Sequence, residues 1–184
     1  MTDVDEHGRP QPSVLYHFSE DPNIERFVPH VPRTNPLQPP AVWAIDRGHA
    51  PLYWFPRDCP RIAVYPFHEG QRAAFEARFT TSARRIHAIE SEWLERMRSV
   101  KIYRYELDAA AFSPWEEANG QWISATEVMP SSVTPIGDLL AAHAAAGIEL
   151  RLVPSLWPLH DVVRDSGFDF SIVRMHNAQA RTSP

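Results

Sequence analysis

The sequence contains one cysteine, Cys59, and only seven glycines among its 184 residues. A lone cysteine excludes an internal disulfide, and no Cys-x-x-Cys or His-x-x-x-His pair offers the spacing of a zinc site, so we predict no bound metal. The glycines form neither Gly-x-Gly-x-x-Gly nor Gly-x-x-x-x-Gly-Lys, which excludes Rossmann and P-loop nucleotide binding on signature grounds. The Gly-x-Ser-x-Gly motif of α/β-hydrolases is also absent.

Long apolar runs and an excess of basic charge are missing as well. No stretch approaches 18 consecutive apolar residues, and the first ten residues are acidic and polar, unlike a secretory signal. We therefore expect a cytoplasmic protein with no membrane partner. With 18 basic and 23 acidic residues the net charge is -5, so nucleic acid is not the favoured partner.

Proline is abundant instead, at 18 residues, and hydrophobic residues make up 43% of the chain, an ordinary globular value. These features predict one α+β domain at 13–178, with flexible tails at 1–12 and 179–184. Prolines crowd 29–40, where an extended loop is expected. The domain should contain a mixed sheet of six or seven strands flanked by three or four helices.

Hydrophobic periodicity places the individual elements. Strand patterns occupy 14–18, 41–45, 61–67, 101–107, 149–153 and 170–175, with an interrupted strand at 121–129. Helical patterns occupy a short segment after Asp46, then 81–98, 136–146 and 156–164. The pattern at 81–98 has the strongest helical spacing, and its charges predict a solvated helical face. These charged residues are Arg84, Arg85, Glu90, Glu92, Glu95, Arg96 and Arg98.

Two segments carry side chains suited to ligand binding. His17 and Ser19 lie where the first strand meets a loop, a common place for ligand contacts. A structural histidine and a serine turn would give the same pattern. The second segment, 42–57, contains Trp43 and Tyr53, which would stack on a flat ligand or pack in a core. Asp46 is interpreted as a helix cap rather than a catalytic acid.

The motifs Leu-Tyr-His-Phe-Ser at 15–19 and Val-Trp-Ala-Ile-Asp at 42–46, followed by a short helix, resemble the first half of the ADP-ribosyltransferase-like fold. That resemblance implies NAD as a substrate. It implies that His17 contacts the ribose on the nicotinamide side and that Tyr53 stacks near nicotinamide. Glu127 would be the glutamate that stabilises the oxocarbenium-like centre. The acceptor of such a transfer stays unknown.

The whole chain also resembles a family of small bacterial proteins of unassigned function, through segments such as 149–151, 155–158 and 170–178. That resemblance implies no chemistry, so two further hypotheses stay open. One is a non-catalytic binding module with an aromatic cleft around Trp43, Tyr53 and Trp54. The other is a metal-dependent hydrolase in which distant histidines converge.

Overall fold

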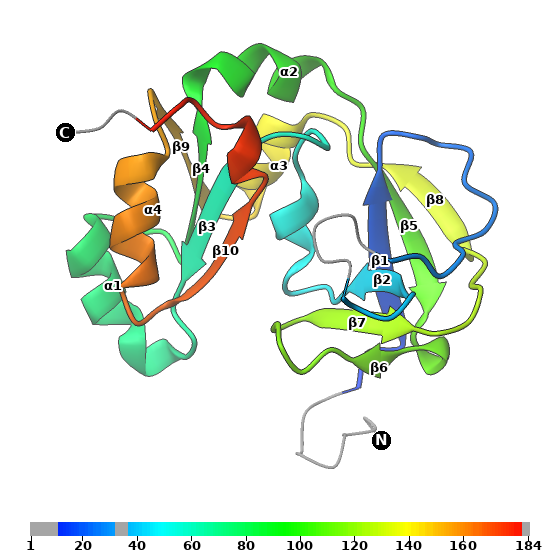
Figure 1. The fold of residues 1–184 in the computed structure, drawn as a ribbon. Helices are drawn as coiled ribbons and strands as arrows, with labels where there is room; N and C mark the ends of the chain where they lie inside the picture. Colours follow the sequence, from blue (N-terminus) through cyan, green and yellow to red (C-terminus); the bar gives the residue numbers. More distant parts are fainter. Residues whose placement is uncertain (1–10, 32–36, 182–184) are drawn as a thin grey trace. The chain divides into compact units, whose positions relative to one another are not determined.

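The computed structural model describes residues 11–31 and 37–181, and their architecture is α+β (Figure 1). The class predicted from the sequence is confirmed, but the strands form two sheets instead of one mixed sheet. The chain divides into two compact units, each made of two chain segments. Unit 1 comprises residues 1–54 and 102–135, and unit 2 comprises 55–101 and 136–184. No helix among the described residues has the length and apolar character to cross a membrane.

Unit 1 contains a six-stranded sheet in the order β6-β7-β2-β1-β5-β8, with every neighbouring pair antiparallel. Its strands are β1 (Val14–Ser19), β2 (Val42–Ile45), β5 (Tyr103–Asp108), β6 (Ser113–Pro114), β7 (Gln121–Ser124) and β8 (Ser132–Pro135). Two 3-10 turns, η1 (Ala50–Tyr53) and η4 (Ala109–Ala111), complete the unit. The strand β1 is central and makes its longest pairing with β5.

Side chains alternate across this sheet, as strand geometry requires. On one side, a buried cluster is built on Leu15 and Leu107, with Val42 and Ala44 from β2 and Phe27 from the segment after β1. The alternate residues of β1 and β2 therefore face the other side of the sheet. They include aromatic side chains that the sequence analysis marked as candidates for ligand contact.

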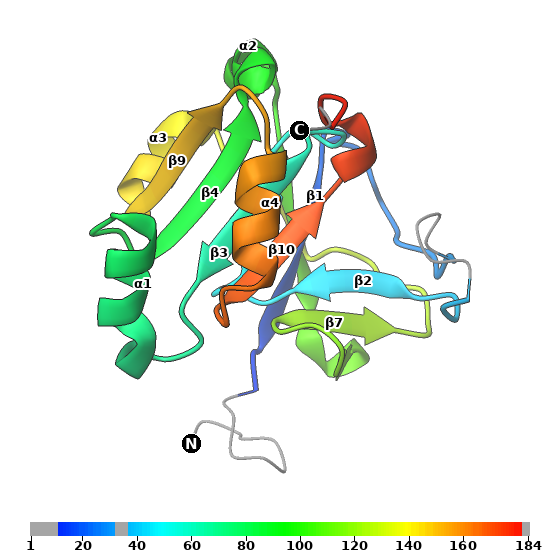
Figure 2. The ribbon, with the colours of Figure 1, turned by 60° about the vertical axis from the view of Figure 1, so that its left-hand side comes forward.

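Unit 2 contains a four-stranded sheet in the order β10-β3-β4-β9, in which β4 and β9 are parallel. Its strands are β3 (Arg61–Tyr65), β4 (Arg85–Glu90), β9 (Ile148–Val153) and β10 (Asp169–Val173). Its helices are α1 (Arg72–Phe79), α2 (Leu94–Ser99), α3 (Leu139–Ala145) and α4 (Trp157–Arg164), with 3-10 turns η2 (Glu69–Gln71), η3 (Ser91–Trp93) and η5 (Met175–Asn177). Figure 2 shows α1 and α4 on one side of this sheet and α3 beside β9 on the other. The apolar side chains of α1 and α4 form the main core with β3 and β4.

The helix predicted over 81–98 is wrong. Residues Arg85–Glu90 form β4, and the helix is limited to η3 and α2 after it. Ile86 and Ile89 are both fully buried, on opposite sides of the strand. A strand buried on both sides reads as a nearly continuous apolar run, and its period cannot be separated from that of a buried helix. The interpretation of the charges as a solvated face fails at Glu90, which is fully buried. It holds for the exposed residues Arg84, Glu92, Glu95, Arg96 and Arg98, and Glu95 pairs with Arg98 within α2.

The strands predicted around β1, β2, β3, β5, β7, β9 and β10 are confirmed, with ends that move by at most two residues except in the interrupted strand at 121–129, where β7 ends at Ser124 and Val128 forms an isolated bridge. The helices α3 and α4 are confirmed as well, and Gly147 after α3 has the expected left-handed φ of 66°. The strand β8 and the helix α1 were not predicted. The predicted tails and the proline-rich loop lie partly outside the described residues.

Candidate functional site

His17 lies in β1 where β1 and β2 separate. Its Nδ1 donates a hydrogen bond of 2.9 Å to the carbonyl oxygen of Trp43 in β2. These two strands share a single register pair, Tyr16 with Ile45, so the imidazole binds β2 beyond the point where its pairing with β1 ends. The prediction that His17 lies at the end of a strand beside a loop is wrong, because β1 continues through Ser19 and His17 pairs with Tyr105 of β5.

The segment that follows β1 packs against the imidazole. The ring of Phe27 lies 4.6 Å from that of His17, centroid to centroid. Phe27 also pairs with Val128 through two backbone hydrogen bonds of 2.8 and 3.0 Å. Tyr105, fully buried, fixes the start of the segment, because its hydroxyl donates to the carbonyl of Asp21 at 2.6 Å. The histidine is thus enclosed by an anchored segment.

Ser19 is buried at the end of β1, and its hydroxyl accepts a hydrogen bond of 3.1 Å from the backbone N–H of Asp21. This is the local serine turn that the sequence analysis gave as its alternative. Asp21 continues the pattern, because its carboxylate accepts from the N–H of Asn23. These bonds set the course of the segment toward Phe27.

A second group, here called the Tyr53 cluster, consists of Phe18, Tyr53 and Gln121. The rings of Phe18 and Tyr53 are nearly parallel, with an interplanar angle of 5° and centroids 6.3 Å apart. The side-chain amide of Gln121 donates to the Tyr53 hydroxyl at 3.4 Å. Phe18 directly follows His17, but consecutive side chains of a strand point to opposite sides, so Tyr53 lies on the other side of the sheet from the His17 ring.

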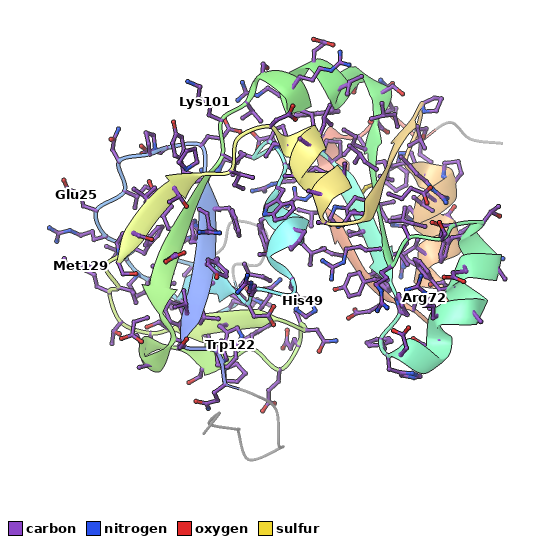
Figure 3. The ribbon with its side chains drawn as sticks, turned by 180° about the vertical axis from the view of Figure 1, so that it is seen from behind. Glu25, His49, Arg72, Lys101, Trp122 and Met129 are labelled. Atoms are coloured by element: carbon purple, nitrogen blue, oxygen red, sulfur yellow. The ribbon has the colours of Figure 1, made fainter. Side chains whose placement is uncertain are left out.

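Asp46 and His49 form a tight pair beside this cluster, on the connection from β2 to η1, where Figure 3 labels His49. The imidazole Nδ1 donates to the Asp46 carboxylate at 2.8 Å, and the same carboxylate accepts from the backbone N–H of His49. A Cβ at Gly120 would lie 2.1 Å from His49 Nδ1, so the ring rests directly on the glycine backbone. Asp46 therefore holds the backbone and the ring of His49. The prediction that it caps a short helix is wrong, because η1 begins at Ala50 with His49 as its N-cap and has no side-chain cap.

Trp43 packs against Trp115, with ring centroids 5.4 Å apart in an edge-on arrangement. Its indole Nε1 is buried and has no hydrogen-bond partner within the described residues. A buried N–H without a partner is costly. Trp43 alternates with the core residues Val42 and Ala44, so its side chain lies on the other side of the sheet from the apolar core of unit 1.

Glu127 lies in the connection between β7 and β8, and its side chain is 46% exposed. Its carboxylate is 3.6 Å from the guanidinium of Arg26. The neighbouring residues Phe27 and Val128 both point into the core of unit 1. Because side chains alternate along extended backbone, Glu127 and Arg26 point to solvent, away from the His17 ring.

The histidines proposed for a metal site do not gather. No group of three or more histidine, cysteine, aspartate or glutamate side chains in the described part of the chain is arranged to hold a metal ion. His160 belongs to unit 2 and binds Asp161 through Nδ1 at 2.9 Å. Burial raises the pKa of the Cys59 thiol to about 12, so near neutral pH it stays protonated and is a poor nucleophile.

All five residues predicted to form a site, His17, Ser19, Trp43, Tyr53 and Glu127, belong to unit 1. His17 binds the backbone of Trp43, Tyr53 packs on Phe18 on the opposite side of the sheet, and Glu127 points to solvent, so the structure does not bring His17, Tyr53 and Glu127 together. Sequence reasoning missed Gln121. Its only signal was a polar side chain at the start of a predicted strand, a pattern too common to be informative.

The two units together define an α+β protein whose candidate binding residues cluster in an antiparallel unit. The chain belongs to the DUF6886 family of unknown function, whose model matches residues 16–178. That match covers both units and confirms the resemblance to a family of unassigned function. No curated protein and no solved structure matches the chain significantly.

Proposed function

We propose that unit 1 binds NAD or a related nucleotide and takes part in an ADP-ribosyltransferase-like reaction. The observation that carries the proposal is the stacked pair of Tyr53 and Phe18, which holds a flat aromatic ring on the side of the sheet opposite the apolar core of unit 1. The resemblance at 15–19 and 42–46 assigns ligand-binding roles to Tyr53 and to His17, the chain neighbour of Phe18. The six-stranded sheet thus joins, in one unit, residues 36 positions apart in the chain.

In this proposal the nicotinamide ring lies against Tyr53. The ribose contact that the resemblance assigns to His17 requires β1 to move, because the imidazole faces the core side of the sheet, opposite Phe18. An aromatic ring held by a second ring and by a hydrogen bond loses little freedom when a ligand stacks on it, which favours binding. Trp43 adds an indole N–H that is buried without a partner, a donor that a ligand oxygen would satisfy. Ser19 contributes by shaping the turn beside His17.

Transfer of ADP-ribose develops positive charge at the anomeric carbon, and a carboxylate stabilises that charge only near the transition state. Glu127 is the proposed carboxylate, but its ion pair with Arg26 points to solvent. An exposed ion pair contributes only about 0–1 kcal/mol, so the side chain can leave Arg26 at little cost. Binding and transfer are therefore separable, with His17 and Tyr53 serving the first and Glu127 the second.

One observation favours a second candidate function, a binding module without transferase chemistry. The polar group next to the Tyr53 hydroxyl is the neutral amide of Gln121, not a carboxylate. An amide can orient a ligand but cannot stabilise a developing cation as a carboxylate does. In this alternative Glu127 has no role, and aromatic residues such as Trp43 and Tyr53 form the binding surface.

Calorimetric titration with NAD, and in parallel with ADP-ribose, tests the binding step. We expect saturable binding that Tyr53→Leu weakens at least tenfold, while the control Tyr103→Leu, in the same unit, stays within threefold of wild type. At about 100 times its dissociation constant a ligand adds roughly 2.7 kcal/mol of stability, so a thermal melt provides an independent check. No binding at millimolar NAD would refute the proposal.

Release of nicotinamide from NAD tests the transfer step. Glu127→Gln should lower turnover at least a hundredfold and leave the NAD dissociation constant within threefold. Glu117→Gln is the matched control, since Glu117 is an exposed glutamate of the same unit. If the wild type binds NAD and releases no nicotinamide with any acceptor, the binding-module function replaces the transferase.

A further inference from the structure

Unit 2 contains two histidines that are hydrogen-bonded to each other in its interior. His87 lies in β4 and His143 in α3, and their rings are 0% and 1% exposed. His143 Nε2 and His87 Nδ1 are 3.0 Å apart, and His143 Nδ1 is 2.7 Å from the carbonyl oxygen of Leu139. This chain of bonds connects the helix to the sheet.

The bonds fix the protons of both rings. The Leu139 carbonyl can only accept, so His143 Nδ1 carries a proton and donates it. A neutral His143 then accepts at Nε2, and His87 must donate from Nδ1. His87 Nε2 is buried, and no group in the described chain bonds to it. Both rings are thus neutral and protonated on Nδ1.

An added proton has no favourable position in this pair. On His143 Nε2 it would shift the His87 proton from Nδ1 to Nε2, where a buried N–H has no acceptor, and it would leave His143 as a buried cation. On His87 Nε2 it would create a buried cation without an acceptor, an expensive arrangement. Protonation at either nitrogen therefore works against the contact between α3 and β4.

The surroundings of His87 oppose protonation too. Phe55 covers both imidazoles, with ring centroids 5.3 Å from His87 and 5.0 Å from His143. From β9 the register partner of His87 is the apolar Leu150. The charged groups that act on His87 are Arg85 of its own strand and Arg61 of β3, together with His143 when protonated. Burial, followed by these charges, places the pKa of His87 well below its ordinary value, and burial lowers that of His143.

We infer that the pair of His87 and His143 is an acid-sensitive latch, which holds α3 on the sheet of unit 2 near neutral pH and releases it as the pH falls. The direction follows from proton linkage. Histidine in an unfolded segment takes up a proton near pH 6.5, whereas the buried pair does not until lower pH. Below about pH 6.5 each histidine therefore raises the opening constant by up to tenfold per pH unit.

Urea unfolding between pH 7.5 and 4.5, followed by amide signals of unit 2, tests this inference. In the wild type, the two buried histidines should raise the unfolding constant by up to a hundredfold per pH unit below pH 6.5. The double variant His87→Leu, His143→Leu should not show this part of the increase. The control His68→Leu, His176→Leu changes two exposed histidines of the same unit and should keep the wild-type profile. An unchanged pH profile in the first double variant would overturn the latch.

Two measurements on the wild-type protein avoid any dependence on a variant that fails to fold. Ring ¹⁵N shifts should show both histidines neutral and protonated on Nδ1 at pH 6, and titration of either folded ring near pH 6.5 contradicts the inference. Hydrogen exchange on acidification should deprotect α3 before α1, which packs on the other side of the sheet. Simultaneous loss of protection in both helices would exclude a selective release of α3.

Discussion

Glu90 provides a quantitative test of how unit 2 is held together. The side chain is fully buried at the end of β4, and both carboxylate oxygens accept backbone hydrogen bonds. One oxygen accepts from the N–H of Leu156, just before α4, at 3.1 Å, and the other from the N–H of Gln179 at 2.9 Å. One carboxylate thus joins three segments that are far apart in the sequence.

Glu90→Gln replaces one of these acceptors by an NH₂ group that faces a backbone N–H. A hydrogen bond to a charged group contributes about 1.5–3 kcal/mol, and a buried donor left without a partner costs about 1–3 kcal/mol. Relief from burying a charge offsets part of that loss. We therefore expect the free energy of unfolding to fall by about 2–4 kcal/mol, a large part of the roughly 5–15 kcal/mol typical of a native protein.

Urea denaturation measures this difference directly. The matched control is Glu95→Gln, whose side chain is 82% exposed and ion-paired with Arg98, and which should change stability by less than about 0.5 kcal/mol. Hydrogen exchange should accelerate at Leu156 and Gln179 in the Glu90 variant alone. If Glu90→Gln costs no more than the control, the carboxylate does not organise unit 2 and the reasoning is refuted.

Two further substitutions test unit 1. Gly120→Ala would place a Cβ 2.1 Å from His49 Nδ1 at a φ of 74°. The control is Gly147→Ala in unit 2, which has a similar φ of 66° but open space around it and should cost about 1 kcal/mol of stability. Gly120→Ala should cost more than this control, and equal melting temperatures of the two variants would contradict the prediction. Tyr105→Phe removes a buried hydroxyl that binds two backbone groups of the segment after β1, so urea unfolding should show a loss of about 1–3 kcal/mol. The comparison Tyr103→Phe, at a partly buried tyrosine packed against the same core, should be nearly neutral, and similar losses from both would show that the hydroxyl bonds of Tyr105 are not responsible.

The strands with one buried side were predictable because alternation marks them. In β5, the fully buried Tyr105 and Leu107 alternate with Arg104 and Glu106, and the register with β1 follows from that pattern. The end of α3 at Gly147 was also predictable, since glycine adopts the positive φ of a helix C-terminus without strain. Local rules determine these features, so one sequence is enough to find them.

The predictions from the sequence are wrong where contacts between distant segments determine the structure. Charged residues such as Arg85 and Glu90 suggested a solvated helix, but the guanidinium of Arg85 lies over the Tyr65 ring and Glu90 binds backbone from two remote segments. The pattern of a single chain does not reveal such partners. The division into two sheets was missed for the same reason, because β4 pairs with β3 and with β9, which lies some sixty residues further along the chain.

The candidate site was predictable in part. The location of His17 in the first strand could be read from the sequence, but β1 continues through Ser19, so the histidine does not lie at its end. The outward direction of Glu127 depends on the pairing of Phe27 with Val128. This contact joins positions about 100 residues apart, and no local motif predicts it. The contacts of Gln121, and those of the pair of Asp46 and His49, depend on strand pairing and could not be predicted from the sequence.

The interleaved order of the two units has a consequence for synthesis on the ribosome. Unit 1 has all its strands once Pro135 has emerged, so its sheet can assemble while the chain is still growing. Residues 55–101 emerge earlier but must wait for 136–184, because β3 and β4 pair with β10 and β9. During that interval the antiparallel pair of β3 and β4 presents two unpaired edges, the kind of transient surface that chaperones protect. The connectivity therefore predicts that nascent chains stalled between 101 and 148 are the most prone to aggregate.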